Sequence, residues 1–383
     1  MLSKLKNLIR FIIYYFINLI IKPAEDIKQK SLLLVRLDAI GDYILFRNYI
    51  EVLKKSEKYK DYSITLLGNN DWKNISEEFD SDFIDNFIWL DKNKFLKDFL
   101  YRYKKFKEIV SNGYEIVLSS VYSREFFYDD NIVKHIFANE KIGHIGDLSN
   151  IKKWQKNISD KYYDKLIPAK DEIIFEFYRN KDFFEILLEA KLDMIKPHID
   201  LMPKKLDYDL PQNYAILFIG ASVSFRKWSI EKFSKVGMHL KEKYNYEIVL
   251  CGGPSDNDSA KEFSYHYKGK YLDLVGKTTL VELLTVIYNG NLILSNETSA
   301  PHFAVALDVE NIFVISNGNH YGRFTPYPKE VVANYHVIYH PEIEKDLGNY
   351  KKLINSYGYR SYLDINEISV ETVKNKIEKV LNG

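Results

Sequence analysis

Short apolar runs alternate along this chain with longer stretches in which apolar residues recur three or four positions apart. The first run is Ser31–Leu37, and the helical spacing follows over Tyr43–Lys55. Continuous apolar runs are typical of strands that are buried on both faces of a parallel sheet. The pattern repeats in predicted strands at Ser63–Leu67, Phe87–Leu90 and Tyr114–Leu118, with a predicted helix over Phe95–Val110. This alternation predicts an α/β domain.

The alternation pauses and then restarts in the second half. Residues 150–200 have a mainly helical and charged pattern, and three prolines between Ile195 and Pro211 indicate a linker. The restarted pattern predicts strands at Tyr214–Ile219, Tyr246–Cys251 and Asn311–Ile315, with helices at Ser229–Lys243, Leu280–Tyr288 and Ile365–Leu381. We therefore expect two α/β halves of similar size, with a ligand cleft between them.

Composition narrows the functional class only slightly. The chain has 383 residues, enough for two cores, and its formal net charge of +1 gives no case for nucleic-acid binding. The single cysteine, Cys251, excludes an intramolecular disulfide and a multi-cysteine zinc site. Because Cys251 lies in an apolar run, we expect a buried structural thiol and a reduced, cytoplasmic compartment.

The N-terminus is apolar and basic. Leu8–Ile21 is strongly apolar, and residues 1–30 carry six Lys/Arg but two Asp/Glu. The run is shorter than the roughly 20 residues that cross a bilayer. It predicts a helix lying on the anionic inner face of the cytoplasmic membrane through residues 2–22. The alternatives are a helix packed on the protein's own core or on a partner subunit, and a single-pass anchor.

The most suggestive chemistry lies in the polar turn Ser295–His302, between the apolar run Asn291–Leu294 and a predicted helix. Backbone N–H groups at the start of a helix lie at the positive end of its dipole and suit a phosphate. The alternative is an ordinary strand–helix turn capped by Thr298 or Ser299.

Each half also has an unusual loop after its first strand. In the first half, Gly41 allows a tight turn and Asp42 follows in the first turn of a helix, so Asp42 is a candidate general base for an incoming hydroxyl. The alternative is a helix-capping aspartate. The loop of the second half contains two hydroxyl and two cationic side chains, namely Ser222, Ser224, Arg226 and Lys227. Such side chains suit the binding of a diphosphate. The alternative is an ordinary solvated turn.

Several known nucleotide and metal patterns are missing from the sequence. It has no P-loop and no dinucleotide fingerprint of three spaced glycines, which disfavours an ATPase or an NAD enzyme. The histidines are scattered without zinc-site spacing, and the short Asp pairs are typical of solvated loops.

Six stretches in order together resemble glycosyltransferase family 9, the heptosyltransferase family. They are Leu34–Asp42, Lys227–Trp228, Gly252–Pro254, Leu274–Thr278, Ser295–His302 and, in one branch of the family, Asn319–Pro328. The resemblance implies a GT-B fold, in which two Rossmann-like domains face each other across the active site. It also implies an inverting, metal-independent transfer from a nucleotide sugar, typically ADP-heptose, with no further cofactor.

The residue pattern and the resemblance, which covers about 31–330, together predict this domain layout: a membrane-associating helix over 1–30, an acceptor-side domain over 31–200, a nucleotide-sugar domain over 201–350 and a helical segment over 351–383. The acceptor is then a hydroxyl of lipopolysaccharide or a related lipid-linked glycan. The alternatives are a sugar-nucleotide epimerase of the same architecture and a non-catalytic relative that binds sugar nucleotides or glycans.

The resemblance also assigns roles to residues. Asp42 matches the proposed base, with Asp38 and Gly41 beside it on the acceptor side, and Lys227 matches a lysine that contacts the diphosphate. The remaining donor-side positions that it assigns are Asp256 near the ribose, Gly276, Lys277 and Thr278 beside the nucleotide base, and Glu297, Thr298, Ser299 and His302 in the turn that binds the donor. To these we add Arg226 and Arg323 as candidate further cations on the diphosphate. Glu297 stands where Asp is common and Ser299 where Gly is common, so the sequence leaves the donor sugar open.

Deleting residues 2–22 should release the protein from membranes, because the deletion removes both the apolar run and most of the local positive charge. Fractionation of cells expressing the full-length and shortened chains measures this. Unchanged membrane association of the shortened chain would refute the assignment.

Overall fold

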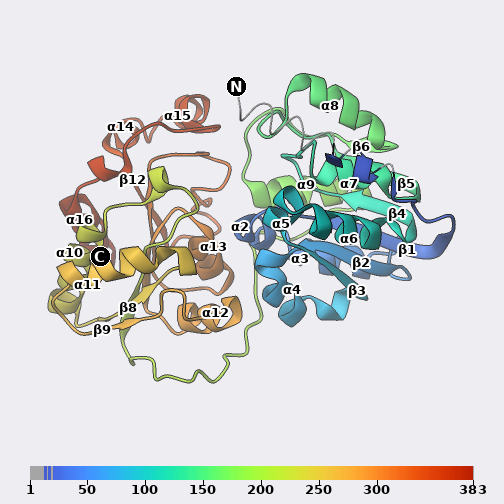
Figure 1. Ribbon diagram of the computed structural model, residues 1–383. Coiled ribbons are helices and arrows are strands. Elements are labelled where there is room, and N and C mark those ends of the chain that lie inside the picture. The colour runs from blue at the N-terminus through green and yellow to red at the C-terminus, as the bar shows by residue number, and fades with distance from the viewer. Residues whose placement is uncertain (1–12, 15, 19, 383) are drawn as a thin grey trace. The chain divides into compact units, whose positions relative to one another are not determined.

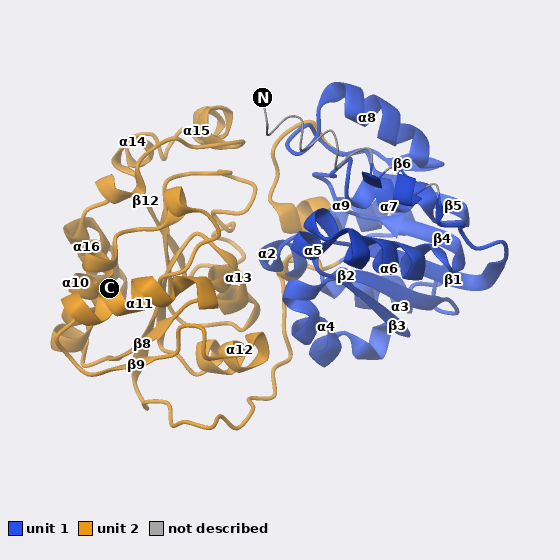
Figure 2. Cartoon of the chain, viewed as in Figure 1, with its two compact units in different colours: residues 1–43, 47–169, 180–192 blue, residues 44–46, 170–179, 193–383 orange. Residues whose placement is uncertain are grey.

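The computed structural model describes residues 13–14, 16–18 and 20–382, and these form two compact units (Figure 2). Unit 1 comprises residues 1–43, 47–169 and 180–192, and unit 2 comprises residues 44–46, 170–179 and 193–383. The residues predicted as a separate segment, 351–383, are part of unit 2, and residues 170–179 belong to unit 2 although they lie inside the predicted first domain.

Unit 1 is built on a parallel six-stranded sheet with the order β3-β2-β1-β4-β5-β6 (Figure 1). Its strands are β1 (Ile27–Arg36), β2 (Ser63–Asn69), β3 (Asn86–Leu90), β4 (Gly113–Ser119), β5 (Ala138–His144) and β6 (Lys165–Ile167). The helices from residue 40 to residue 188 are α2 (Ile40–Ile44), α3 (Asn48–Lys55), α4 (Lys73–Phe79), α5 (Lys92–Lys97), α6 (Phe99–Val110), α7 (Asp129–His135), α8 (Lys153–Ser159) and α9 (Glu176–Leu188). Successive residues Leu32, Leu33 and Leu34 of β1 are all fully buried, so both faces of the sheet are covered.

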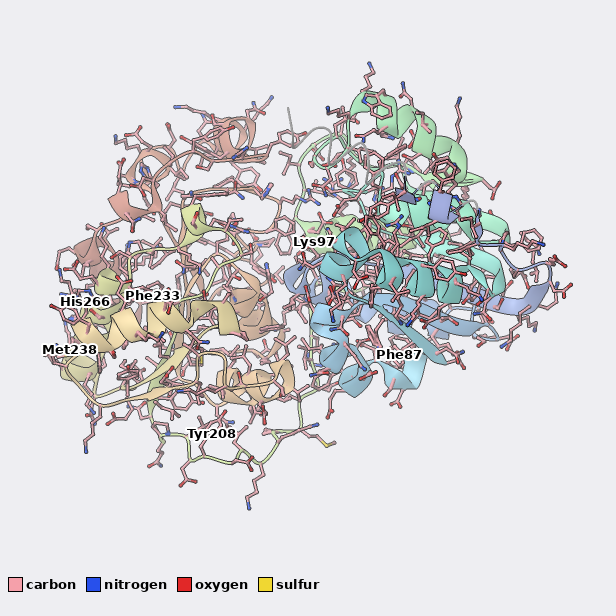
Figure 3. The ribbon with its side chains drawn as sticks, viewed as in Figure 1. Phe87, Lys97, Tyr208, Phe233, Met238 and His266 are labelled. Carbon is pink, nitrogen blue, oxygen red and sulfur yellow. The ribbon has the colours of Figure 1, made fainter. Side chains whose placement is uncertain are left out.

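Unit 2 repeats this plan with the order β12-β11-β10-β7-β8-β9, again all parallel. Its strands are β7 (Tyr214–Phe218), β8 (Glu247–Cys251), β9 (Tyr271–Asp273), β10 (Leu292–Asn296), β11 (Ile312–Ser316) and β12 (Tyr335–Tyr339). Its later helices are α10 (Ile230–Tyr244), α11 (Asn257–His266), α12 (Leu280–Tyr288), α13 (Ser299–Ala306), α14 (Pro341–Glu344), α15 (Tyr350–Tyr357) and α16 (Val370–Leu381). Phe233 of α10, which is labelled in Figure 3, belongs to the core of this unit. Ile377 of α16, Leu217 and Leu250 belong to the same core.

Both sheets have the same strand order when the strands of each are counted along the chain. The first strand is central, the second and third lie on one side of it, and the fourth, fifth and sixth lie on the other. In this doubly wound order, strands two and three are added on one side of strand one, and strands four to six are added on the other. Ligands bind beside the carboxyl ends of strands one and four, where the order reverses. The predicted α/β architecture is confirmed.

Several predicted elements differ in detail. The single helix expected over Phe95–Val110 is two helices, because Asp98 is extended and its carboxylate accepts hydrogen bonds from the backbone N–H groups of Leu100 and Tyr101 as the N-cap of α6. The helix expected over Tyr43–Lys55 is likewise divided into α2 and α3.

The sequence pattern missed β5, β6 and β12. β5 is partly exposed and carries Glu140 and Lys141, and β6 has three residues, so neither forms a continuous apolar run.

The predicted membrane-associating segment lies largely outside the described residues. Positions 13, 14, 16–18 and 20 are helical. The Asn18 side chain donates a hydrogen bond to Asn131 Oδ1 at 2.8 Å, and Ile21 joins the core of unit 1. The described part therefore packs on the chain's own core, and membrane contact remains a prediction.

Among the helices of the described residues, none combines the length and the apolar character needed to cross a bilayer. Cys251 is buried, as predicted, and burial raises the pKa of its thiol well above the ordinary value.

Candidate functional site

In unit 1 the candidate loops lie where the strand order reverses. Arg36, the last residue of β1, has a side chain that is 1 % exposed. Its guanidinium pairs with Asp38 Oδ2 at 2.7 Å and donates to the backbone carbonyl of Ser120, after β4, at 3.3 Å. It also donates to the backbone carbonyl of Asp42 at 3.5 Å. One buried cation thus joins the loops after β1 and β4 and places predicted residues Asp38 and Asp42 around itself.

Aromatic packing fixes the turn that contains Gly41 and Asp42. Both residues lie in the short helix α2, with Asp42 in its first turn. The next residue, Tyr43, stacks on Trp72 with ring centroids 3.7 Å apart, and the Trp72 indole donates to the Asp38 carbonyl at 3.1 Å. Asp42, which is half-buried, therefore lies in a turn held by buried groups.

In unit 2 the loops after β7 and β10 meet through Asn296. This fully buried side chain donates to the Ile219 carbonyl at 2.8 Å and accepts from the Trp228 backbone N–H at 3.0 Å. The turn proposed for phosphate and the loop carrying Ser222, Ser224, Arg226 and Lys227 are thus brought to one edge of the sheet.

The polar turn Ser295–His302, called the donor turn from here on because it is proposed to bind the donor, leads into helix α13. Thr298 occupies the N-cap position with extended backbone, and its side chain makes no capping hydrogen bond. Ser299 is the first helical residue. Since the first N–H groups of a helix have no intrahelical partners, this end of α13 presents donors and a positive dipole to an anion.

Glu297 lies beside that helix end and is 5 % exposed. Ser316 donates a hydrogen bond to Glu297 Oε2, while Oε1 is buried and has no hydrogen-bond partner among the described residues. Burial raises the pKa of Glu297 to about 6, against the opposing effects of the Arg226 charge and the Ser316 hydroxyl. This position is therefore filled by a carboxyl group that retains its proton to higher pH than an ordinary glutamate.

His302, on the buried side of α13, is neutral at physiological pH because burial lowers its pKa to about 4. Its Nδ1 lies 2.8 Å from the Tyr327 hydroxyl. Burial keeps the pKa of Tyr327 well above its usual value, so the two groups share a neutral hydrogen bond. His302 thus ties α13 to the segment that follows β11.

Lys227 and Asp256 form an ion pair at 2.6 Å. The sequence predicts a donor-binding role for each of them separately. The Asp256 carboxylate also accepts from the Gly253 N–H at 3.0 Å. A Cβ at Gly220 would lie 2.5 Å from Asp256 Oδ2, so this glycine makes room for the carboxylate between the ends of β7 and β8. The ammonium group of Lys227 is held there with its side chain 30 % exposed.

The segment with Gly276, Lys277 and Thr278 lies beside the loop after β8. The Gly276 N–H donates to the Gly252 carbonyl at 3.0 Å, and its φ of +66° favours glycine. Lys277 pairs with Asp273 at 2.5 Å. In the neighbouring loop, Arg226 donates to Ser222 Oγ at 2.6 Å, and Ser224 is exposed.

Arg323, unlike the predicted donor-binding residue Lys227, pairs with a residue of the segment 170–179. Its Nε donates to Glu176 Oε2 at 2.9 Å, and the side chains are 11 % and 3 % exposed. The Glu176 N–H also donates to the Arg323 carbonyl at 2.8 Å. This pair fastens residues 170–179 to unit 2, so Arg323 has a structural partner and its contact with a donor remains a prediction.

The sequence reasoning did not nominate four residues that position the site: Arg36, Glu176, Asn296 and Tyr327. Arg36 and Asn296 are polar residues that end otherwise apolar strands, which was a usable signal. Glu176 and Tyr327 act through partners that are distant in sequence, so no local pattern marks them.

The two doubly wound sheets define the class of the protein as a GT-B fold, as solved structures bear out. A family 9 glycosyl transferase from Veillonella parvula matches with a TM-score of 0.69 and 19 % identity, over 94 % of this chain and 99 % of that one. The ADP-heptose LPS heptosyltransferase II of E. coli matches with a TM-score of 0.65 and 14 % identity, over 92 % and 98 %. E. coli heptosyltransferase WaaC with ADP gives 0.65 and 14 %, over 91 % and 99 %.

The family model for glycosyltransferase family 9 (heptosyltransferase) matches residues 175–352, somewhat less than half of the chain. This match confirms the resemblance seen in the motifs and, with it, the glycosyltransferase class of enzyme. The matched residues include the donor turn and Lys227, whereas Asp38, Gly41 and Asp42 lie outside them. A search of curated protein sequences gives no match.

The raised pKa of Glu297 predicts a pH effect on stability. Between pH 4.5, the ordinary value, and about 6 the unfolded chain releases this proton while the folded chain retains it, so wild-type stability falls as pH rises. Relative to Glu297→Gln, the wild type should lose about 2 kcal/mol of unfolding free energy between pH 4 and pH 7. Urea unfolding at a series of pH values measures this difference. Glu262→Gln, at an exposed position, is the control variant, and a flat difference for Glu297→Gln would contradict the assignment.

Proposed function

We propose that this chain transfers a sugar from a nucleotide-sugar donor to a saccharide hydroxyl of lipopolysaccharide or a related cell-surface glycan, with inversion and without a metal. The observation that carries the proposal is the convergence, at the carboxyl edge of the unit 2 sheet, of the α13 N-terminus with the Lys227–Asp256 pair. The E. coli relatives are described with ADP, ADP-heptose and a fluorinated ADP-heptose, so ADP-heptose is the first donor to test.

In this proposal the donor diphosphate is held by the N–H groups of the α13 turn and by the ammonium group of Lys227. Lys227 is paired with Asp256, and its side chain is 30 % exposed, so the ammonium group is accessible to a phosphate. Positive groups aimed at the diphosphate stabilise the negative charge that grows on it as the bond to the sugar breaks. Lys227 and the helix end then supply the charge that a divalent metal supplies in other enzymes.

Asp42 is proposed as the general base. A carboxylate in hydrogen-bond reach of the acceptor hydroxyl takes its proton as the oxygen attacks the anomeric carbon from the face opposite the leaving diphosphate. The bond from the acceptor oxygen to the anomeric carbon forms, the bond from that carbon to the diphosphate breaks, and the configuration inverts. Arg36 and the Tyr43–Trp72 stack hold the turn from which Asp42 projects.

Location at the inner membrane surface, through residues 2–22, completes the proposal, since a lipid-linked acceptor lies there. The apolar and basic character of this segment supports it.

A thermal-shift screen against ADP-, GDP-, UDP- and dTDP-sugars, each with its free nucleotide as control, tests the donor assignment. One nucleotide family should stabilise the wild type, and Lys227→Gln should weaken that binding by about ten- to a hundredfold through loss of a charged hydrogen bond. The exposed Lys235→Gln should bind like the wild type. Absence of a shift with every nucleotide would overturn the proposal.

Asp42→Asn and Asp42→Ala should lower the transfer rate by about 10² to 10⁴ while donor binding stays intact, because the base acts on the acceptor. The rate is measured as nucleotide release dependent on acceptor, and binding as the thermal shift. Asp71→Asn, an exposed acid of unit 1, is the control. Wild-type turnover in either Asp42 variant would eliminate Asp42 as the base.

A further inference from the structure

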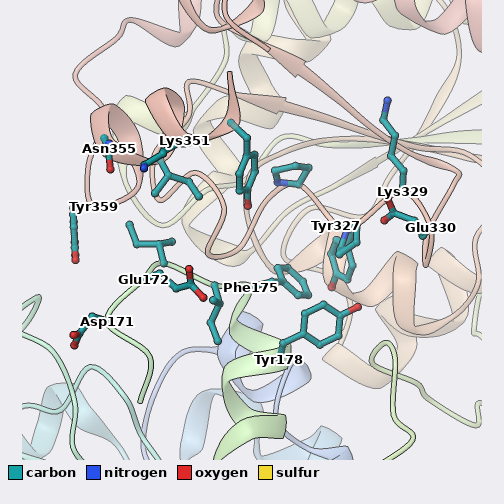
Figure 4. Close-up of a pocket in the computed structure, with 16 residues that line it drawn as sticks. Asp171, Glu172, Phe175, Tyr178, Tyr327, Lys329, Glu330, Lys351, Asn355 and Tyr359 are labelled. Atoms are coloured by element: carbon teal, nitrogen blue, oxygen red, sulfur yellow. The ribbon is translucent and has the colours of Figure 1, made fainter. Parts of the chain in front are cut away.

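A cavity of about 1000 Å³ lies within unit 2, apart from the donor turn (Figure 4). Three stretches line it: residues 171–178, residues 326–330, and α15 with Tyr359 after it. The volume is at the upper end of the roughly 300–1,000 Å³ of small-molecule sites, so the cavity has room for a ligand of more than one ring.

Aromatic side chains line the cavity. Tyr359 and Tyr350 are 63 % and 49 % exposed although they line a concave surface. On the opposite side, Phe175 packs against Tyr327 with ring centroids 4.6 Å apart. Exposed rings on a concave wall offer flat apolar surface to a ligand that has an apolar face of its own.

The polar side chains of the cavity are available to a ligand. Within the described residues, no hydrogen bond or ion pair engages the carboxylates of Asp171 and Glu172 or the side-chain amide of Asn355. Carboxylates accept hydrogen bonds, and an amide both donates and accepts, which suits several hydroxyl groups. The lining holds three carboxylates, with Glu330 as the third, against two lysines, so its charge does not favour an anion.

The backbone that presents these groups is firmly anchored. The buried Arg179 guanidinium donates to the carbonyls of Lys170 at 3.5 Å and Glu172 at 3.1 Å. Ile173 lies so close to Gly358 that a Cβ there would be 2.3 Å from its Cδ1. Polar side chains that have no partner among the described residues, on a backbone held in this way, indicate a preorganised binding wall more than a solvated turn.

We infer that this cavity is a saccharide-binding subsite, with pyranose rings stacked on Tyr359 and Tyr350 and their hydroxyls bonded to Asp171, Glu172 and Asn355. A pyranose presents C–H bonds on its faces and hydroxyls around its rim, which matches aromatic walls edged with acceptors. The cavity connects to the donor turn, because its lining residue Tyr327 bonds to His302 of α13. We identify this saccharide as part of the acceptor glycan, and that identification rests on the proposed function. The inference that the cavity binds a sugar does not depend on the proposed function.

Saturation-transfer NMR on the full chain tests the inference with methyl pyranosides of glucose, galactose, mannose and N-acetylglucosamine at millimolar concentration. At least one should receive saturation from the protein. Tyr359→Ala should weaken its binding by about two- to tenfold, the range for one aromatic contact, and Tyr359→Phe should retain it. The double variant Asp171→Asn/Glu172→Gln should weaken binding of the same sugar more than Tyr359→Ala does.

Tyr362→Ala is the matched control, since Tyr362 is 84 % exposed, lies three positions from Tyr359 and does not line the cavity. Transfer to none of the four sugars, or equal binding by wild type, Tyr359→Ala and the double variant, would overturn the inference. The nucleotide screen separates the two proposals. Nucleotide binding without sugar binding refutes the subsite alone, whereas sugar binding without nucleotide binding refutes the proposed transfer and leaves the subsite.

Discussion

In each unit a single buried polar side chain joins the loops on either side of the point where the strand order reverses. The loops after strands one and four leave the sheet in opposite directions, so their backbone groups lose the partners that the ladder provides. Arg36 restores these bonds in unit 1, and Asn296 in unit 2. Both side chains are almost completely buried, so removing either leaves polar groups unsatisfied at a cost of about 1–3 kcal/mol each. The geometry of Asp42 and of the donor turn depends on these two bridges.

At the carboxyl edge of the unit 2 sheet, carboxylates lie close to cations in the protein itself. Asp256 holds Lys227, and Glu297 lies within the influence of Arg226. Burial outweighs the Arg226 charge and the Ser316 hydroxyl at Glu297, so its pKa is raised and not lowered. An ionised carboxylate repels an anion bound at the neighbouring helix end. Because its raised pKa makes Glu297 easier to protonate, Glu297 can become neutral and then does not repel such an anion.

The sequence sufficed wherever the local pattern was strong. The apolar runs of β1, β7 and β10 predicted buried parallel strands, and the polar residues that follow them predicted the site loops. The pattern failed where tertiary contacts decide. The polar strand β5 is stabilised by its neighbours, and the break at Asp98 depends on a cap. Likewise, the ion pair of Lys227 with Asp256 spans 29 positions and that of Arg323 with Glu176 spans 147, so only the fold brings them together.

Residues 170–179 show how far such long-range contacts reorganise the chain. Their position in the sequence places them in the first half, yet the Glu176–Arg323 pair and the contact of Ile173 with Gly358 make them part of unit 2. The glycine and the buried pair have structural roles, but together they fix a wall that carries Asp171 and Glu172. The side chains of these two residues have no hydrogen-bond or ion-pair partner within the described part of the chain. These contacts hold the backbone that carries the two carboxylates at the cavity, which is the arrangement that the proposed saccharide subsite needs.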